Sequence, residues 1–160
     1  MRNRAASFCS TDAATEACAA GLTTGARAGG GAAGGGVAVR GRGGGVGSWV
    51  VEALARSAVG HLALVDADDI CLSNTSRQLH ALGGNYGANK AEVLASRCRA
   101  INPAIAVEAV AEFLTPSNLA DRLDRGYDLV VDACDSFRTK VEMIAWCRRR
   151  KLPVVVSGSA

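Results

Sequence analysis

Short β-branched runs alternate with longer stretches of helical period from residue 37 onward. The pattern predicts strands over 37–39, 61–65, 105–110, 127–131 and 153–156. Between them, helical periodicity predicts helices over about 46–58, 87–100, 116–125 and 137–151. Strands that alternate with helices in this way are typical of parallel βαβ units. We therefore expect an α/β fold over residues 37–160, a Rossmann-like parallel sheet with helices on both faces.

The expected helix ends carry residues that favour such positions. Thr115 before Pro116 fits an N-cap followed by proline in the first helical position, and Gly126 fits a C-terminal stop for the same helix. Asn102 and Pro103 end the helix before them, because proline restricts the residue that precedes it. Ligands of such a sheet bind at the carboxyl ends of its strands, where the winding reverses. The chemistry is therefore expected in the loops after the first, second and fourth strands.

The first 36 residues differ in composition from the rest of the chain. Residues 1–47 hold 13 of the 19 glycines and five arginines against two acidic residues, while the remainder has 13 basic and 13 acidic residues. The net charge of +3 therefore belongs to this N-terminal part. A glycine-rich segment buries too little apolar surface to offset the entropy of ordering it. We expect residues 1–36 to be a low-complexity segment, disordered or translated out of frame.

The remaining composition narrows the class of protein. A chain of 160 residues with 49% hydrophobic residues suffices for one core, and no stretch reaches the roughly 20 apolar residues of a membrane span. The six cysteines form no C-x-x-C pair and no signal peptide opens the chain. We expect a cytoplasmic protein with reduced thiols and no membrane partner.

A glycine-rich loop follows the first expected strand. Gly43, Gly45 and Gly47 stand directly before an apolar helix, where backbone N–H groups can bind phosphate. An ordinary glycine linker is the alternative interpretation. Asp66 ends the second expected strand, about 20 residues on, where a carboxylate can accept hydrogen bonds from a ribose. A solvated carboxylate at a strand end is the alternative for that residue.

Charged residues farther along favour ATP over a nicotinamide cofactor. Arg77, which follows Asn74 in the second loop, offers a fork for phosphate oxygens, and Lys90 offers a compact cation near a helix start. Asp132 and Asp135 follow the fourth expected strand, and such carboxylates suit Mg²⁺. Each residue also has an ordinary alternative: a surface ion pair for the arginine, a helical pair for the lysine, and an N-cap for Asp135.

Six segments that span the expected loops and helix starts carry a family pattern. They are GVGSW at 45–49, EALAR at 52–56, DADD at 66–69, NTSRQLHAL at 74–82, KAE at 90–92 and DACDS at 132–136. Together they resemble the ThiF/MoeB/ubiquitin-activating adenylyltransferase superfamily. The RQLHAL and DS variants are most similar to the tRNA threonylcarbamoyladenosine dehydratase subfamily.

The resemblance implies a cytoplasmic, dimeric enzyme that uses ATP and Mg²⁺ to activate the carboxylate of threonylcarbamoyladenosine on tRNA and to close it into a ring with loss of water. Sulfur-transfer proteins are further implied partners. By position, Gly43, Gly45, Gly47 and Asp66 would hold the nucleotide. Asn74, Arg77 and Lys90 would bind the phosphates, and Asp135 would hold the metal. Arg77, Lys90 and Asp135 are thus the expected catalytic residues.

Two departures from the family pattern bear on activity. Arg40 and Arg42 stand where the family has an apolar strand and a regular glycine loop, and a buried strand does not readily accept an unpaired arginine. A one-base shift of Arg-Gly-Arg-Gly codons reads Val-Gly-Val-Gly, so we hypothesise that much of 1–44 is out of frame; resequencing the DNA tests this. The chain also ends at Ala160, inside the turn after the last expected strand, so we expect a domain truncated at its C-terminus.

Three other functions stay open on sequence grounds. They are an activator of a sulfur-carrier or ubiquitin-like protein, an inactive nucleotide-binding or dimerisation module, and an NAD-dependent oxidoreductase. Residues 148–151 form the basic run RRRK, for which we favour a role at a helix end over a tRNA contact. We expect Cys71, Cys98, Cys134 and Cys147 to be small core residues.

Overall fold

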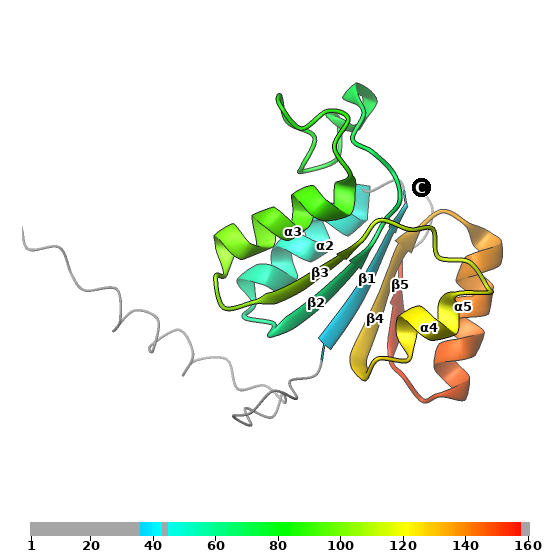
Figure 1. Cartoon of the computed structure of the whole chain (residues 1–160). Coiled ribbons are helices and arrows are strands. Elements are labelled where there is room, and N and C mark those ends of the chain that lie inside the picture. The colour runs from blue at the N-terminus through cyan, green and yellow to red at the C-terminus, as the bar shows by residue number, and fades with distance from the viewer. Residues whose placement is uncertain (1–35, 43–44, 158–160) are drawn as a thin grey trace, which may run out of the picture. The chain divides into compact units, whose positions relative to one another are not determined.

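Five parallel strands form one sheet in residues 36–42 and 45–157, the part of the chain that the computed structural model describes (Figure 1). The strands are β1 (Gly36–Arg42), β2 (His61–Val65), β3 (Ala106–Val110), β4 (Tyr127–Cys134) and β5 (Val154–Val156). Their order across the sheet is β3-β2-β1-β4-β5, and every neighbouring pair is parallel. The Rossmann-like parallel sheet that the pattern predicts is confirmed.

Helices cover both faces of this sheet. The helices are α2 (Gly45–Arg56), α3 (Lys90–Ile101), α4 (Leu119–Leu123) and α5 (Phe137–Arg149), with a short 3₁₀ turn, η1 (Leu72–Asn74). Figure 1 shows α2 and α3 on one face and α4 and α5 on the other. The side chains alternate between the two faces along each strand, as the pleat requires. Val39 and Leu64 thus pack with α2 and α3, whereas Val130 packs with Met143 of α5.

The winding reverses between β1 and β4. The chain builds β1, β2 and β3 outward in one direction, and then returns to place β4 on the other side of β1. Such a reversal opens a crevice at the carboxyl ends of the two central strands. Residues 66–89, which join β2 to α3, extend beyond this end of the sheet (Figure 1).

Most expected elements are present with shifted ends. Helix α3 begins at Lys90 because Asn89 caps it, its side-chain oxygen accepting hydrogen bonds from the Ala91 and Glu92 amides. It ends before Asn102, as predicted. The predicted helix stop at Gly126 is wrong, because α4 ends at Leu123 with Asp124 as its C-cap. Gly126, with φ +75°, lies in the turn before β4, at a position that favours glycine.

The predicted start of α4 is wrong. The Thr115 amide donates a hydrogen bond to Oδ1 of Asn118 (2.8 Å), and the Asn118 amide donates to the Thr115 carbonyl (3.2 Å). These bonds close a turn around Pro116, so the helix begins only at Leu119. Thr115 therefore caps a turn and not the helix, because a nearby amide side chain competes for its backbone.

Strands β1 and β4 are longer than predicted, and both extensions carry charge. Arg40 lies inside β1 and is 6% exposed, beside Asp132 in the register of β4. Arg40 Nη1 and Asp132 Oδ1 are 3.7 Å apart, and Lys140 of α5 donates a hydrogen bond to the other carboxylate oxygen. The predicted end of the first strand at 39 is therefore wrong, because a buried carboxylate accompanies the arginine. The out-of-frame hypothesis for 1–44 stays a prediction, and residues 1–35, 43 and 44 lie outside the described residues.

Candidate nucleotide-binding site

Two glycines bring the start of α2 against the end of β1. A Cβ on Gly41 would lie 2.7 Å from Oδ2 of Asp66, so a side chain at this position would displace that carboxylate. A Cβ on Gly47 would lie 3.4 Å from Cβ of Ala133, so the first turn of α2 packs closely on the sheet. The free N–H groups at the start of a helix attract anions. Gly45 and Gly47 therefore lie at the crevice, and their binding of a phosphate stays a prediction. Gly43 lies outside the described residues.

Asp66 is fixed at the carboxyl end of β2. It is 7% exposed, its Oδ1 accepts a hydrogen bond from the Asp68 amide (3.0 Å), and its own amide donates to the Val110 carbonyl (3.1 Å). The carboxylate thus sits beside Gly41 at the reversal of the winding. This is the position at which an acidic residue of a Rossmann-like sheet can bind a ribose.

The loop after β2 carries Arg77 to the start of α2. The aliphatic part of Arg77 lies beside Gly45, where a Cβ would be 3.5 Å from Cγ and Cδ of the arginine. Trp49 Nε1 donates a hydrogen bond to the Arg77 carbonyl (3.3 Å), and the Ser48 hydroxyl accepts one from the Leu79 amide (3.2 Å). These two bonds tie the loop to α2. Arg77, which is exposed, is thereby held beside the anion-attracting helix start.

Asn74 shapes this loop from within. It is 7% exposed, and its Oδ1 accepts a hydrogen bond from the Cys71 amide (2.9 Å). In this structure its side chain therefore closes η1. A contact between Asn74 and a phosphate stays a prediction.

Lys90 places a buried cation beside the same crevice. It is the first residue of α3 and is 4% exposed, with Nζ 3.4 Å from Oδ2 of Asp68. A cation is unfavourable at the positive end of a helix. Asp68 offsets that cost, which keeps the ammonium in place for a ligand with several negative charges.

Asp132 and Asp135 lie in different surroundings near the carboxyl end of β4. Asp135 directly follows Cys134 and is exposed, next to the end of β1. Asp132 lies inside β4 with no exposed surface, on the α5 face, where Lys140 bonds it. Of these two carboxylates, Asp135 is the exposed one beside the end of β1, and its role as a metal ligand stays a prediction. The prediction that Asp132 follows the strand is wrong, because β4 continues to Cys134. Within the described ranges, no three His, Cys, Asp or Glu side chains are grouped to hold a metal ion.

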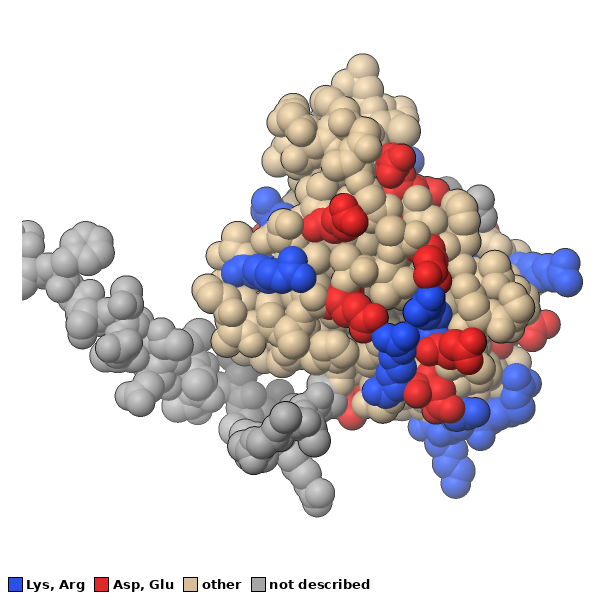
Figure 2. Space-filling model, in the orientation of Figure 1, with Lys and Arg blue, Asp and Glu red and all other residues tan. Residues whose placement is uncertain are grey.

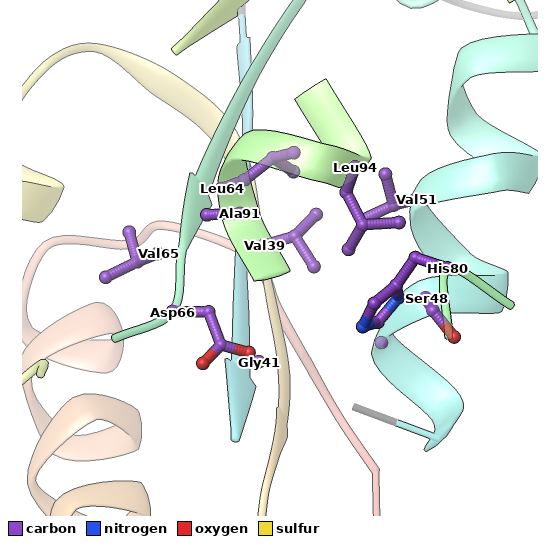
Figure 3. Close-up of a pocket in the computed structure, with 11 residues that line it drawn as sticks. Val39, Gly41, Ser48, Val51, Leu64, Val65, Asp66, His80, Ala91 and Leu94 are labelled. Carbon is purple, nitrogen blue, oxygen red and sulfur yellow. The ribbon is translucent and has the colours of Figure 1, made fainter. Parts of the chain in front are cut away.

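His80 is a site residue to which the sequence motifs assigned no role. It borders a cavity of about 20 Å³ between the sheet and α2, together with Gly41, Gly47, Ser48 and Asp66 (Figure 3). The ring is 1% exposed, and neither nitrogen has a hydrogen-bond partner among the described residues. Burial, with a smaller contribution from the charge of Lys90, lowers the pKa of His80 to about 4. His80 is thus a neutral group at neutral pH.

Lys140 is the second residue that sequence reasoning missed. Its Nζ donates hydrogen bonds to Asp132 and to the Ser157 carbonyl (2.9 Å), which joins α5, β4 and the end of β5. Its place in the first turn of the helix after Asp132 and Asp135 was the available signal, since a lysine there can reach back to the strand end.

The arrangement fits a nucleotide with charged phosphates. A helix start, an exposed arginine and a buried lysine supply positive potential, and Asp66 supplies a carboxylate for a ribose. Among the described cysteines, Cys98, Cys134 and Cys147 are buried as expected, whereas Cys71 is exposed. Burial raises the pKa of Cys134 at the end of β4, which disfavours its thiolate form. The fold and the site therefore define a Rossmann-like nucleotide-binding domain.

Comparison with known proteins agrees with this class. The ThiF family matches residues 35–160, and the chain belongs to that family. It is 53% identical over 117 residues to the tRNA threonylcarbamoyladenosine dehydratase of Escherichia coli, which covers 73% of this chain and 44% of the relative. The dehydratase of Haemophilus influenzae is 51% identical, with 73% and 45% covered. The chain spans less than half the length of these curated relatives.

Solved structures show the same fold. The crystal structure of E. coli TcdA in complex with ATP superposes with a TM-score of 0.76 at 51% identity, covering 79% of this chain and 51% of that one.

Among the described residues, no helix is both long and apolar enough to span a membrane.

Proposed function

We propose that this chain is the ATP-binding part of a tRNA threonylcarbamoyladenosine dehydratase. The observation that carries the proposal is the 53% identity to the E. coli dehydratase, whose crystal structure with ATP has the same fold. The crevice supports it, because Asp66, Arg77 and Lys90 converge there with the start of α2. The substrate would be a tRNA that carries threonylcarbamoyladenosine.

Activation is the step that these residues serve. A carboxylate is a poor electrophile; its attack on the α-phosphate of ATP releases pyrophosphate and gives an acyl-adenylate with a good leaving group. Arg77 and Lys90 would hold the phosphates and stabilise the charge that develops on them. Asp66 would orient the ribose. An oxygen or nitrogen of the modified base then closes a ring on the activated carbon and displaces AMP, so the net change in the substrate is loss of water.

Asp135 fits a Mg²⁺ ligand in this scheme. Mg²⁺ binds through one or two carboxylates and completes its shell with water and substrate phosphates, so a protein cluster of several ligands is not required. Asp135 is exposed at the reversal of the winding, beside the expected phosphates. When bound, the metal would neutralise phosphate charge.

The expected partners follow from the same assignment. We propose a cytoplasmic homodimer that acts on tRNA and receives help from sulfur-transfer proteins. Exposed apolar side chains on α2 and on η1, Trp49 (59% exposed) and Leu72 (74% exposed), suit a protein interface of this kind.

The proposal is tested by ATP binding and by tRNA-dependent ATP hydrolysis. Lys90→Met removes the buried cation and is expected to weaken ATP binding at least about tenfold, since a charge-assisted hydrogen bond contributes about 1.5–3 kcal/mol. Arg56→Met is the matched control, because Arg56 is exposed at the far end of α2 and pairs only with Glu52. Hydrolysis should respond to tRNA with threonylcarbamoyladenosine and not to unmodified tRNA. Equal ATP affinity in the two variants would contradict the assigned site.

Activation of a carrier protein is the second candidate. The sulfur carrier protein adenylyltransferase of Thermus thermophilus is 40% identical to this chain over 97 residues. Pyrophosphate exchange that depends on a carrier-protein C-terminus, with no response to tRNA, would favour it. A chain that binds ATP but gives neither reaction would be an inactive nucleotide-binding module.

A further inference from the structure

Four consecutive basic residues end α5 and form the turn after it. Arg148, Arg149, Arg150 and Lys151 are all exposed. Beyond residue 47 the chain has equal numbers of basic and acidic residues, so this run is a local concentration of positive charge. In Figure 2, Lys and Arg side chains gather at the lower edge of the view, where α5 ends in Figure 1.

Of these four side chains, only that of Arg150 contacts a partner among the described residues. Its guanidinium pairs with Asp124 and lies 4.8 Å from the centre of the Trp146 ring, and its amide closes the end of α5 on the Trp146 carbonyl (3.2 Å). The side chains of Arg148, Arg149 and Lys151 make no ion pair or hydrogen bond with any other described residue. The three are hereafter called the α5 basic patch.

The helix dipole accounts for part of this charge only. The end of a helix carries about half a negative charge, and its effect falls off within the last turn. Arg150 already lies at the C-cap position, where its charge complements the dipole. The three charges of the α5 basic patch therefore exceed what the helix end needs.

The surroundings suit an extended anionic partner. Trp146, Arg150 and Lys151 line an open groove of about 380 Å³, whose lining also includes two carboxylates, Asp124 and Asp128. Asp124 is neutralised by its pair with Arg150, whereas Asp128 disfavours phosphates at the start of β4, so an anion is favoured at the helix end. Arginine forks bind phosphate oxygens in pairs, whatever the base sequence.

The patch also lies within reach of the crevice. Helix α5 begins at Phe137, two residues after Asp135, and its 13 residues span about 20 Å. Double-stranded RNA can contact a single small domain over about 16 base pairs, which is a longer distance. One RNA stem can therefore touch the patch while a loop at its end reaches the crevice.

We propose that the α5 basic patch binds the phosphates of a tRNA stem while the modified nucleotide lies in the crevice. This rests on the proposed function, which supplies the RNA, and it extends that function to a second surface. It also goes beyond our preference for a purely helix-end role of residues 148–151. Arg148 and Arg149 lie in the last turn of α5, but of the four side chains only that of Arg150 has a partner among the described residues.

The test compares two variants of the full chain that lose the same charge. Arg148→Ala with Arg149→Ala removes most of the patch, and Arg56→Ala with Arg99→Ala removes the basic residues in the last turns of α2 and α3, on the other sheet face. The Kd of a tRNA is measured over a series of salt concentrations. The patch variant should bind about tenfold more weakly at low salt, and its slope of log K against log salt should fall by about 1.4–1.8, for two lost phosphate contacts.

The control pair should keep the tRNA Kd and slope of the wild-type chain. Circular dichroism and ATP affinity, both expected to be unchanged, show that each variant is folded. Equal changes in tRNA affinity in the two variants, or no tRNA binding by the wild-type chain, would refute the proposal that the α5 basic patch binds tRNA. Failure of the proposed function has a different signature: no tRNA-dependent ATP hydrolysis by the wild-type chain, while a selective loss of RNA affinity in the patch variant still supports the patch.

Discussion

The burial of His80 makes the stability of the fold depend on pH. The folded protein holds the ring neutral, because burial lowers its pKa to about 4 from the usual 6.5. The unfolded chain takes up a proton at about pH 6.5, so between these two values it binds more protons than the folded state. The contribution of His80 is therefore fully present above pH 6.5 and is lost as the pH falls toward 4.

The two pKa values set the size of this effect. One pKa unit corresponds to about 1.4 kcal/mol, so the difference amounts to about 3 kcal/mol at pH 4 and about 2 kcal/mol at pH 5. Small domains have a free energy of unfolding of about 5–15 kcal/mol, so a loss of 2 kcal/mol is readily measured.

Urea unfolding at pH 7.5 and pH 5 measures it, in the wild-type chain and in His80→Leu. Leucine fills a similar space and does not titrate, so the drop in free energy of unfolding between the two pH values should be about 2 kcal/mol smaller in the variant. Carboxylates titrate in both proteins, and their contribution cancels in this comparison. The same drop in both proteins would refute the assignment of a buried, neutral His80.

Two further predictions concern the crevice and the charges behind it. Gly41→Ala should weaken ATP binding at least about tenfold with little change in the free energy of unfolding, because the new Cβ would displace the Asp66 carboxylate. Unchanged ATP affinity in calorimetry would show that the Asp66 carboxylate does not contact the nucleotide. Asp132→Asn leaves the charges of Arg40 and Lys140 uncompensated and should lower the free energy of unfolding by about 3 kcal/mol, at the lower end for a buried pair because Lys140 keeps the Ser157 carbonyl. A loss below about 1 kcal/mol in urea unfolding would show that these charges are solvated.

Local pattern was sufficient for most of the architecture. The β-branched runs and the helical periods between them predict the order of the elements, since burial on both faces of a parallel sheet requires such runs. The same reasoning placed Asp66 and the glycine loop at one edge of the sheet, because all parallel strands present their carboxyl ends there. These inferences need only the periodicity of the chain.

The ends of the helices and strands depend on contacts between polar residues, which a pattern of apolar positions does not show. Asn118 bonds back to Thr115, which delays α4 by one turn, and this competition between two polar residues is invisible to a pattern of apolar positions. Strand β1 continues through Arg40 because Asp132 lies beside it in the neighbouring strand, 92 positions along the chain.

The sequence by itself therefore determined the fold class, the edge of the sheet that carries the crevice, and the residue types expected there. The tertiary structure decided which of these side chains face the crevice: it turns Asp132 to Lys140 on the opposite face and brings His80 into the space beside Asp66. The physical reason is that hydrophobic periodicity fixes how each element packs, whereas the direction of a polar side chain depends on partners that only the folded chain brings together.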